Sequence, residues 1–388
     1  MENVSSSNGL EKYPKLRFKG FTEPWEHVKL SDFVSRVTRK NSDNQTDIPL
    51  TISSKDGLIN QNEFFSKQVA SKDMSGYYLL QRGEFAYNKS YSVGFDFGSI
   101  KRLEKYDQGA LSTLYICFAL ERFDSDFIKH YFDSLKWYRE IYMISAEGAR
   151  NHGLLNVPTE DFFATLHTLP MDAAEQRKIA ELLDLLTAKI EKQQSLVDNL
   201  KKYKRGLLDA IFNQKIHVTN DDEEWQECRI GDILKILHGR DYKDYQAPNG
   251  EYPVLGTGGV IDYATKYLCD WACVLIGRKG TIDKPQYMDK PFWTVDTLFY
   301  SKPESSHNPK FQYYLFQTIN WKKYNEASGV PSQSSSTIEG INVCVPNPHT
   351  QETIANLFSR VDELIDDHAV MLARLQECKK GLMQQLFI

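Results

Sequence analysis

The chain has 388 residues, of which 41% are hydrophobic, and it carries 47 lysines and arginines against 52 aspartates and glutamates. This size and composition suit two or three globular domains and exclude a largely disordered chain. No apolar run approaches the about 20 residues that cross a membrane, and six scattered cysteines fit free thiols in a reducing compartment, so we expect a cytoplasmic protein.

The first half of the chain is expected to begin with a tail and one domain. Residues 1–13 are polar and predict a flexible tail. Residues 14–169 are rich in tyrosine, phenylalanine, glycine and short β-prone runs such as 111–118, and a helix is expected over residues 126–143. These patterns predict a domain of mixed α/β structure.

A long central helix then occupies most of residues 170–218. Asp172 is expected to cap its start, Glu175 completes a capping box, and the helix ends near Asn213. A second domain follows over residues 219–346, and residues 347–388 form a second long helix that starts near Thr350. The predicted fold class is α+β, with two mixed α/β domains, each followed by a long helix.

The two helices give the clearest evidence that the chain contains an internal repeat. Residues 176–213 align without a gap on residues 351–388, at a constant offset of 175. Ten of the 38 pairs are identical, where average residue usage would give roughly two or three. The segment that begins at Trp25 also aligns with the one that begins at Trp225. Each half is therefore predicted to be a variable domain followed by a related helix.

Both helices carry a heptad pattern, which predicts that they pair as a coiled coil. The apolar seam positions are Leu183, Leu186, Ile190, Val197, Leu200 and Leu207 in the first helix, and Phe358, Val361, Ile365, Leu372, Leu375 and Leu382 in the second. The short connections allow parallel or antiparallel pairing. Antiparallel pairing about a pseudo-twofold axis would place the two domains at opposite ends of the helix pair. This arrangement suits two separated DNA half-sites better than parallel pairing does.

Polar residues and glycines also recur at matched positions in the helices. Gln193 matches His368, and Lys204 matches Lys379. A polar residue in a seam fixes the register, although the two lysines could equally lie beyond the tight part of the seam. Gly206 and Gly381 indicate either a close approach of backbones or the end of a helix.

The sequence lacks the common catalytic motifs. It has no phosphate-binding Gly-x-x-x-x-Gly-Lys-Ser/Thr loop, no Asn/Asp-Pro-Pro-aromatic site of an amino-methyltransferase, no nucleophile elbow and no His-Glu-x-x-His pair. Cys269 and Cys273 are a close pair, but no second Cys or His pair stands at zinc-site spacing. We therefore predict a chain that is not an enzyme and binds no metal.

Residues suited to DNA lie in loops at matched places in the two domains. A glycine-flanked turn in the second domain carries Arg278, Lys279 and Thr281, and the matching place in the first carries Lys89, Ser90 and Tyr91. The loop in the first domain precedes residues 111–115, and the loop in the second domain precedes the related residues 295–299. A second pair of loops carries Arg150 and Asn151 in the first domain, and Ser332 and Gln333 in the second. Any one loop could be an ordinary surface turn, but the matched placement favours DNA contacts.

The overall charge is unusual for a DNA-binding chain. The formal net charge is −5, and residues 221–345 carry 13 lysines and arginines against 17 aspartates and glutamates. Phosphate contacts come from lysine and arginine, so any basic face must be assembled by folding.

Taken together, these features resemble the specificity subunit of type I restriction-modification systems. The resemblance rests on residues 14–21 with Trp25, on the Gly-Arg-Lys-Gly-Thr turn at 277–281 with residues 292–298, and on the two Gln-x-x-Ile-Ala-x-Leu helices that end in Lys-Arg/Lys-Gly-Leu. It covers nearly the whole chain.

The resemblance implies two target recognition domains, each of which reads one half of a split DNA site. It implies that the helices form an antiparallel coiled coil that sets the spacer and docks two methyltransferase subunits. S-adenosylmethionine, ATP and Mg are then expected in the methyltransferase and restriction/translocase partner chains, with no cofactor bound by this chain. A tandem-repeat coiled-coil scaffold that binds only protein, and an enzyme that binds a cofactor, remain alternatives.

Overall fold

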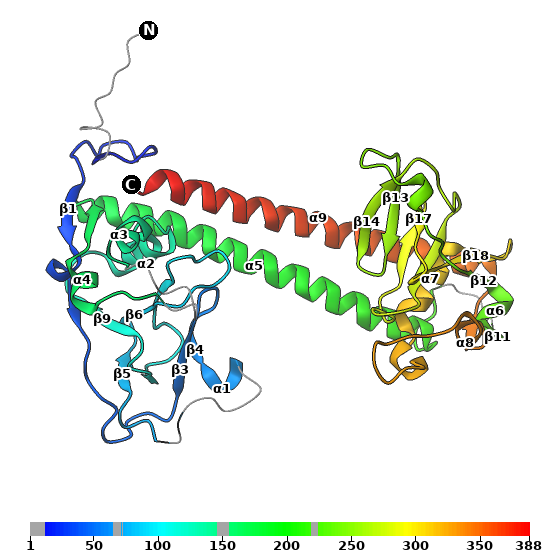
Figure 1. The fold of residues 1–388 in the computed structure, drawn as a ribbon, viewed down its shortest axis with the longest axis horizontal. Helices are drawn as coiled ribbons and strands as arrows, with labels where there is room; N and C mark the ends of the chain where they lie inside the picture. Colours follow the sequence, from blue (N-terminus) through cyan, green and yellow to red (C-terminus); the bar gives the residue numbers. More distant parts are fainter. Residues whose placement is uncertain (1–11, 65–70, 72, 146–154, 219–223) are drawn as a thin grey trace, which may run out of the picture. The chain divides into compact units, whose positions relative to one another are not determined.

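The computed structural model describes residues 12–64, 71, 73–145, 155–218 and 224–388. The chain divides into two compact units: unit 1 is Met1–Lys192 with Met371–Ile388, and unit 2 is Gln193–Val370. The helices α5 (Ala173–Phe212) and α9 (Pro348–Leu386) each contribute a segment to both units (Figure 1). Each unit therefore combines one globular domain with part of each long helix.

The domain of unit 1 is built from short strands and four short helices in its described residues. Its strands are β1 (Glu26–Lys29), β2 (Val34–Arg36), β3 (Pro49–Ser53), β4 (Gly57–Asn60), β5 (Tyr78–Gln81), β6 (Phe85–Asn88), β7 (Ser99–Arg102), β8 (Gln108–Leu111), β9 (Ile116–Leu120) and β10 (Leu166–Leu169). Its helices are α1 (Gln61–Phe64), α2 (Ser125–Asp133), α3 (Tyr138–Ile144) and α4 (Thr159–Ala164), with a 3-10 helix at Leu30–Asp32. One sheet has the order β2-β9-β6-β7, another has the order β4-β3-β8-β5, and β1 pairs with β10.

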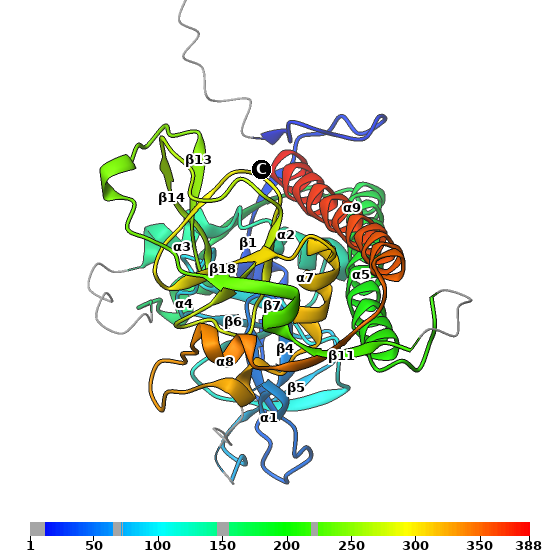
Figure 2. The same cartoon turned by 90° about the vertical axis from the view of Figure 1, so that its right-hand side faces the viewer.

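The domain of unit 2 is built in a similar way. Its strands are β11 (Gln226–Arg229), β12 (Leu234–Leu237), β13 (Tyr252–Gly256), β14 (Gly259–Ala264), β15 (Cys273–Gly277), β16 (Gln286–Met288), β17 (Trp293–Thr294), β18 (Leu298–Pro303) and β19 (Asn342–Val345). Its helices are α6 (Ile230–Ile233), α7 (Pro309–Thr318) and α8 (Ser335–Glu339), with 3-10 helices at Lys243–Tyr245 and Trp321–Tyr324. Helix α7 lies against β15 and β16 of one sheet (Figure 2).

The strand pairings of unit 2 are all matched in unit 1. The sheet order β2-β9-β6-β7 matches β12-β18-β15-β16, and the pair β1 and β10 matches β11 and β19. Strand β3 pairs antiparallel with β4 and parallel with β8, as β13 does with β14 and β17. Strand β5, which pairs with β8, extends the sheet of unit 1 alone. The internal repeat therefore includes the domains and not only the helices.

The long helices pack against each other in an antiparallel direction within each unit. In unit 2, Gln193 donates to the His368 carbonyl (2.9 Å), and further along α5 the Lys204 ammonium lies 2.6 Å from the Asp362 carboxylate, which comes earlier in α9. In unit 1, Lys379 of α9 donates to the Thr187 hydroxyl of α5 (2.7 Å). All twelve predicted seam residues are buried or half-buried.

The polar residues in the seam of the helix pair form hydrogen bonds or ion pairs with the facing helix. Lys204 and Lys379 are half-buried and have partners on the facing helix, and Gln193 contacts its own repeat counterpart, His368. These contacts favour a role in fixing the register over a position outside the seam. For the two glycines, the expected close approach is wrong: a Cβ added at Gly206 or Gly381 would meet nothing within 4 Å. Both glycines also lie inside a helix and not at its end.

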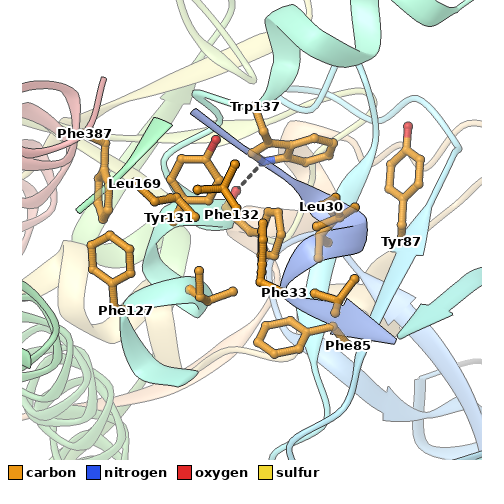
Figure 3. Close-up of a cluster of buried hydrophobic side chains, with 14 of the residues drawn as sticks. Leu30, Phe33, Phe85, Tyr87, Phe127, Tyr131, Phe132, Trp137, Leu169 and Phe387 are labelled. Atoms are coloured by element: carbon orange, nitrogen blue, oxygen red, sulfur yellow. Dashed lines mark hydrogen bonds between the residues drawn. The ribbon is translucent and has the colours of Figure 1, made fainter. Parts of the chain in front are cut away.

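The core of unit 1 is dominated by aromatic side chains from the sheet and from α2. Figure 3 shows Phe33, Phe85 and Phe132 gathered beside Trp137, whose indole Nε1 donates to the Phe132 carbonyl (2.7 Å). Phe387, from the end of α9, contacts Phe127 in the same cluster. Unit 2 repeats this arrangement around Phe311, Phe316 and Trp321, whose indole donates to the Phe316 carbonyl (2.8 Å).

Several sequence-based expectations for unit 1 need correction. The helix expected over 126–143 is two helices, α2 and α3, because Leu135 between them has a φ of 64° and interrupts the helical path. The run 111–118 is the end of β8, a turn and the start of β9. The Lys12 carbonyl accepts a hydrogen bond from the Trp25 backbone (2.9 Å), and residues 1–11 of the expected tail lie outside the described residues.

The start of α5 was predicted only in part. Asp172 caps it as expected by accepting from the backbone of Ala174 (2.7 Å). Glu175 does not complete a capping box toward Asp172. Instead its buried carboxylate accepts hydrogen bonds from the guanidinium of Arg17 (2.7 Å) and from the indole of Trp25 (3.3 Å). The second long helix begins at Pro348, with Asn347 accepting from the Thr350 backbone (2.8 Å).

Candidate nucleic-acid interface

In unit 2, the structure joins the two loops that the sequence singled out. The first loop leaves β15 at Gly277 and carries Arg278, Lys279 and Thr281. The Gly280 backbone donates to the Pro331 carbonyl (2.8 Å) and the Gln333 backbone donates to the Arg278 carbonyl (3.0 Å). A β-bridge also links Lys279 to Ser332. The two loops that carry the five predicted residues of this domain are therefore joined to each other.

Glycine is required where the first loop turns. A Cβ on Gly277 would lie 2.1 Å from the Thr281 carbonyl oxygen, and Gly280 has a φ of 84°. These two positions allow the chain to fold back tightly after the buried strand. The turn presents Lys279 to solvent, whereas Arg278 and Thr281 are half-exposed.

Two side chains of this surface behave differently from the prediction. Gln333 is buried and its amide donates to the Gly277 carbonyl (2.8 Å). It therefore links the two loops through a buried hydrogen bond and does not face a ligand. The guanidinium of Arg278 forms an ion pair with Asp296, a residue of the segment before β18. The positive charge of Arg278 is thus partly balanced in the free protein.

The second loop also holds a negative charge. Thr337 and Ser334 donate to the Glu326 carboxylate and hold its pKa below the ordinary value. The Glu326 backbone in turn donates to the Ser332 carbonyl (2.8 Å). A fixed carboxylate beside Ser332 disfavours a phosphate at this end of the surface and suits a donor group such as the amino group of a base.

Unit 1 presents the corresponding first loop after β6. Lys89 and Ser90 are half-exposed, and the residue Tyr91 is 56% exposed, so an aromatic side chain of a type that stacks on bases is accessible to solvent here. The Leu155 backbone donates to the Lys89 carbonyl (2.9 Å), so the exit of the second loop is tied to the first as in unit 2. Arg150 and Asn151 lie outside the described residues.

Two exposed cations at matched positions of the two domains were missed by the sequence reasoning. Arg139 of α3 and Lys323 both stand two residues after a buried tryptophan, Trp137 and Trp321 respectively. In unit 2, Asn325 follows Lys323 and accepts a hydrogen bond from the Ser332 backbone (2.9 Å). The segments 111–115 and 295–299 align at an offset of 184 residues. At the same offset, Phe127, Phe132 and Trp137 align with Phe311, Phe316 and Trp321, so extending the alignment to α2 and α7 would have matched Arg139 with Lys323.

The cysteine pair does not form part of a larger ligand set in the described residues. The Cys269 and Cys273 sulfurs lie 4.0 Å apart and both residues are buried. Across the described parts of the chain, no group of three or more His, Cys, Asp and Glu side chains is arranged to hold a metal ion. In the same residues, no helix combines the length and the apolar character needed to cross a membrane.

Comparison with known proteins shows which family part of this chain resembles. Residues 222–376, less than half of the chain, match the model of the type I restriction modification DNA specificity domain. Over 190 residues the chain is 24% identical to the specificity subunit of the type I restriction enzyme MjaVIII of Methanocaldococcus jannaschii. That alignment covers 45% of this chain and 44% of the relative, so it spans less than half of the relative's length.

Solved structures share the fold of this chain along almost its whole length. The type I restriction-modification S subunit from M. genitalium matches with a TM-score of 0.63 at 15% identity, over 97% of this chain and 99% of that one. A chain from a structure that describes complex assembly and conformational transition of the type I system matches with a TM-score of 0.57 at 15% identity, over 95% and 99%. At this identity the likeness concerns the fold.

Proposed function

We propose that this chain is a specificity subunit of a type I restriction-modification system and that each of its domains reads one half of a bipartite DNA site. The observation that carries this proposal is the repeated pair of joined loops. The loop after β6 is tied to the chain at Leu155, and the loop after β15 is tied to the chain at Gln333. Two domains with the same strand order and different loop residues suit two half-sites of different sequence.

The loop chemistry supports both kinds of DNA contact. Lys279 and Lys89 are suited to phosphates, Arg278 to a guanine edge or a phosphate, and Ser332 and Thr281 to either. When Arg278 binds DNA it exchanges the carboxylate of Asp296 for a DNA acceptor. That exchange lowers the net binding free energy gained from the contact. A small net gain suits a residue that discriminates between bases more than a residue that supplies most of the affinity.

The long helices are proposed to form one antiparallel coiled coil that sets the spacer between the half-sites and docks two methyltransferase subunits. Large apolar side chains that remain exposed along them support a docking role, namely Leu185, Leu196, Tyr203, Val370 and Met371. We propose that the chain itself is not catalytic. Methyl transfer from S-adenosylmethionine, and ATP- and Mg-dependent translocation and cleavage, would belong to the methyltransferase and restriction/translocase subunits.

A domain exchange tests the proposal directly. Residues 225–345 are replaced by the corresponding domain of another specificity subunit, and the methylated sites are mapped by long-read sequencing in cells that also carry the methyltransferase. We expect one half of the methylated sequence to change while the other half and the spacer persist. A change in both halves would contradict independent domains, and unaltered methylation would favour a protein scaffold that does not read DNA.

A further inference from the structure

The two lysine layers of the helix pair are satisfied in different ways. In unit 2, the Lys204 ammonium lies 2.6 Å from the Asp362 carboxylate, which also accepts from the Tyr314 hydroxyl (2.9 Å). In unit 1, the counterpart Lys379 donates only to the neutral hydroxyl of Thr187 (2.7 Å). Thr187 occupies the repeat position of Asp362. Unit 1 therefore keeps the half-buried lysine but lacks the carboxylate that balances it in unit 2.

Lys379 faces a hollow of about 430 Å³ in unit 1. Its walls are formed by α5, α9, α2, β7 and the turn before β4, and they include Thr187, Lys101, Lys129 and Lys55. This volume is within the roughly 300–1,000 Å³ typical of small-molecule sites. A lysine that is half-buried at the wall of such a hollow is accessible to a small ligand.

The hollow has an excess of positive charge. Six lysines and arginines line it against four carboxylates. Ion pairs engage Lys101 with Asp133 (2.6 Å), and Lys129 with Asp184 of α5 (3.2 Å). No ion pair within 4.0 Å engages Lys55, Lys105 or Lys379 among the described residues. Three ammonium groups that form no ion pair among the described residues therefore line the space together with the carboxylates of Asp56 and Glu191, and positive charge remains in excess.

The electrostatic state of Lys379 is consistent with a missing anion. Burial lowers the pKa of its ammonium, the nearby Lys129 and Lys101 lower it further, and Asp133 and Asp184 offset this only in part. An anion beside Lys379 would replace the water that burial removes and would offset the repulsion from the two other lysines.

We propose that this hollow binds a small phosphate-bearing anion, with the ammonium groups of Lys379 and Lys129 as direct partners and Lys55 and Lys105 at its rim. Thr187 positions Lys379, since its own hydroxyl donates to the Leu183 carbonyl (2.7 Å). Ammonium groups are donors that phosphate oxygens accept from. A recessed lysine suits a small ligand, whereas the phosphates of a DNA duplex lie on a convex surface. Inorganic phosphate and the phosphate chain of a nucleotide are the two sources of this chemistry.

The internal repeat offers a matched variant for the test. Thr187→Asp builds into unit 1 the carboxylate that unit 2 already has, so it should occupy Lys379 internally without leaving an unpaired group. Lys202→Met, at an exposed position of α5, lowers the net charge by the same amount and controls for the general electrostatic effect. Thr187→Asn has the size of the aspartate without its charge.

Binding of inorganic phosphate and of ATP without Mg is measured on the full chain by isothermal titration calorimetry at constant ionic strength. We expect saturable binding to the unmodified chain, a loss of about tenfold or more in affinity in Thr187→Asp, and little change in Lys202→Met. Thr187→Asn should lose much less than Thr187→Asp. Tighter binding of ATP than of phosphate would identify a nucleotide, and equal affinities would identify the free anion.

Three outcomes would overturn the proposal. The first is no binding of either anion up to ~10 mM. The second is equal affinity in Thr187→Asp and in the unmodified chain. The third is displacement of phosphate by a short duplex that lacks any target site, which would assign the hollow to the DNA backbone. None of these outcomes bears on reading by the loops, so the two proposals fail independently.

Discussion

Gln176 and Gln351 occupy matched places in the two long helices and make the same hydrogen bonds. The Gln176 side chain accepts from the backbone of Asp124, the N-cap of α2, and donates to the Pro170 carbonyl (both 2.8 Å). The Gln351 side chain accepts from Asn308, the N-cap of α7 (3.0 Å), and donates to the Pro346 carbonyl (2.9 Å). Each glutamine therefore fastens a helix of its domain to a long helix.

This role predicts the effect of removing one glutamine. Gln351→Ala removes the acceptor of the half-buried Asn308 backbone amide and the donor to the buried Pro346 carbonyl, and the loss of a partner costs a buried group about 1–3 kcal/mol. Hydrogen exchange should show lost protection in α7 and unchanged protection in α2. The exposed neighbour Glu352→Ala serves as the control. Equal losses in both domains would show that the effect is global and not one of local fastening.

His167 makes the stability of unit 1 depend on pH. Its ring lies between the Tyr131 hydroxyl (2.8 Å) and the Thr165 hydroxyl (2.9 Å), and burial lowers its pKa from the ordinary 6.5 to about 3. Because the unfolded chain binds the proton more readily, the contribution to stability is complete above pH 6.5 and is lost as the pH falls toward 3.

We therefore expect urea unfolding of unit 1 to need less denaturant at pH 5 than at pH 7. His167→Gln removes this titration and should flatten the difference, while His27→Gln, at an exposed position, should preserve it. An unchanged pH dependence in His167→Gln would show that other groups are responsible.

The loop residues allow a test of DNA contact at the residue scale. Arg278→Ala and Lys89→Ala should each weaken DNA binding, by about 1–3 kcal/mol for a base contact or with a shallower salt slope for a phosphate contact. Lys201→Ala, at an exposed position of α5, controls for net charge. Affinities measured across a salt series would refute the assignment if both loop variants matched the control.

At the scale of elements, the helix pair depends on its charged layer. The Lys204 ammonium is largely covered, and Asp362 is its partner at 2.6 Å. Asp362→Ala would leave a covered charge unpaired, and we expect a cost of about 3 kcal/mol. Replacing both residues together, as Lys204→Met with Asp362→Leu, should restore most of the stability. A double variant as unstable as the single one would show that Asp362 acts through Tyr314 instead.

At the scale of the whole molecule, the helices are proposed to act as a ruler. Inserting seven residues after Gln193 and seven after Asp367, positions that face each other, should lengthen the rod by ~10 Å. Because a base pair rises ~3.4 Å, the methylated spacer should grow by about three base pairs, with weaker modification because the domains also rotate. Insertions of two residues break the heptad and should abolish assembly. An unchanged spacer in the heptad variant would show that the helices do not measure the DNA.

What the sequence determined by itself is the order of the parts. The heptads and the ten shared identities identify the two long helices, and the matched Trp25 and Trp225 mark the start of each domain. These features could be predicted because helix periodicity and an ungapped repeat depend on residues that are close together in the chain. In the second domain, Gly277 and Gly280 mark the turn that carries Arg278 and Lys279, and this turn could be predicted from the sequence.

Only the tertiary structure decided which of those residues face solvent. Gln333 became a buried brace because Gly277, 56 residues away, supplies its acceptor. The break at Leu135 follows from packing of Trp137 against the core, which local helix propensity does not report. Thr187 and Asp362 occupy the same position of the repeat but are different residues. Only the fold shows that Lys379 faces Thr187 and that Lys204 faces Asp362. Such environments are set by residues distant in sequence, which is why pattern and spacing do not reveal them.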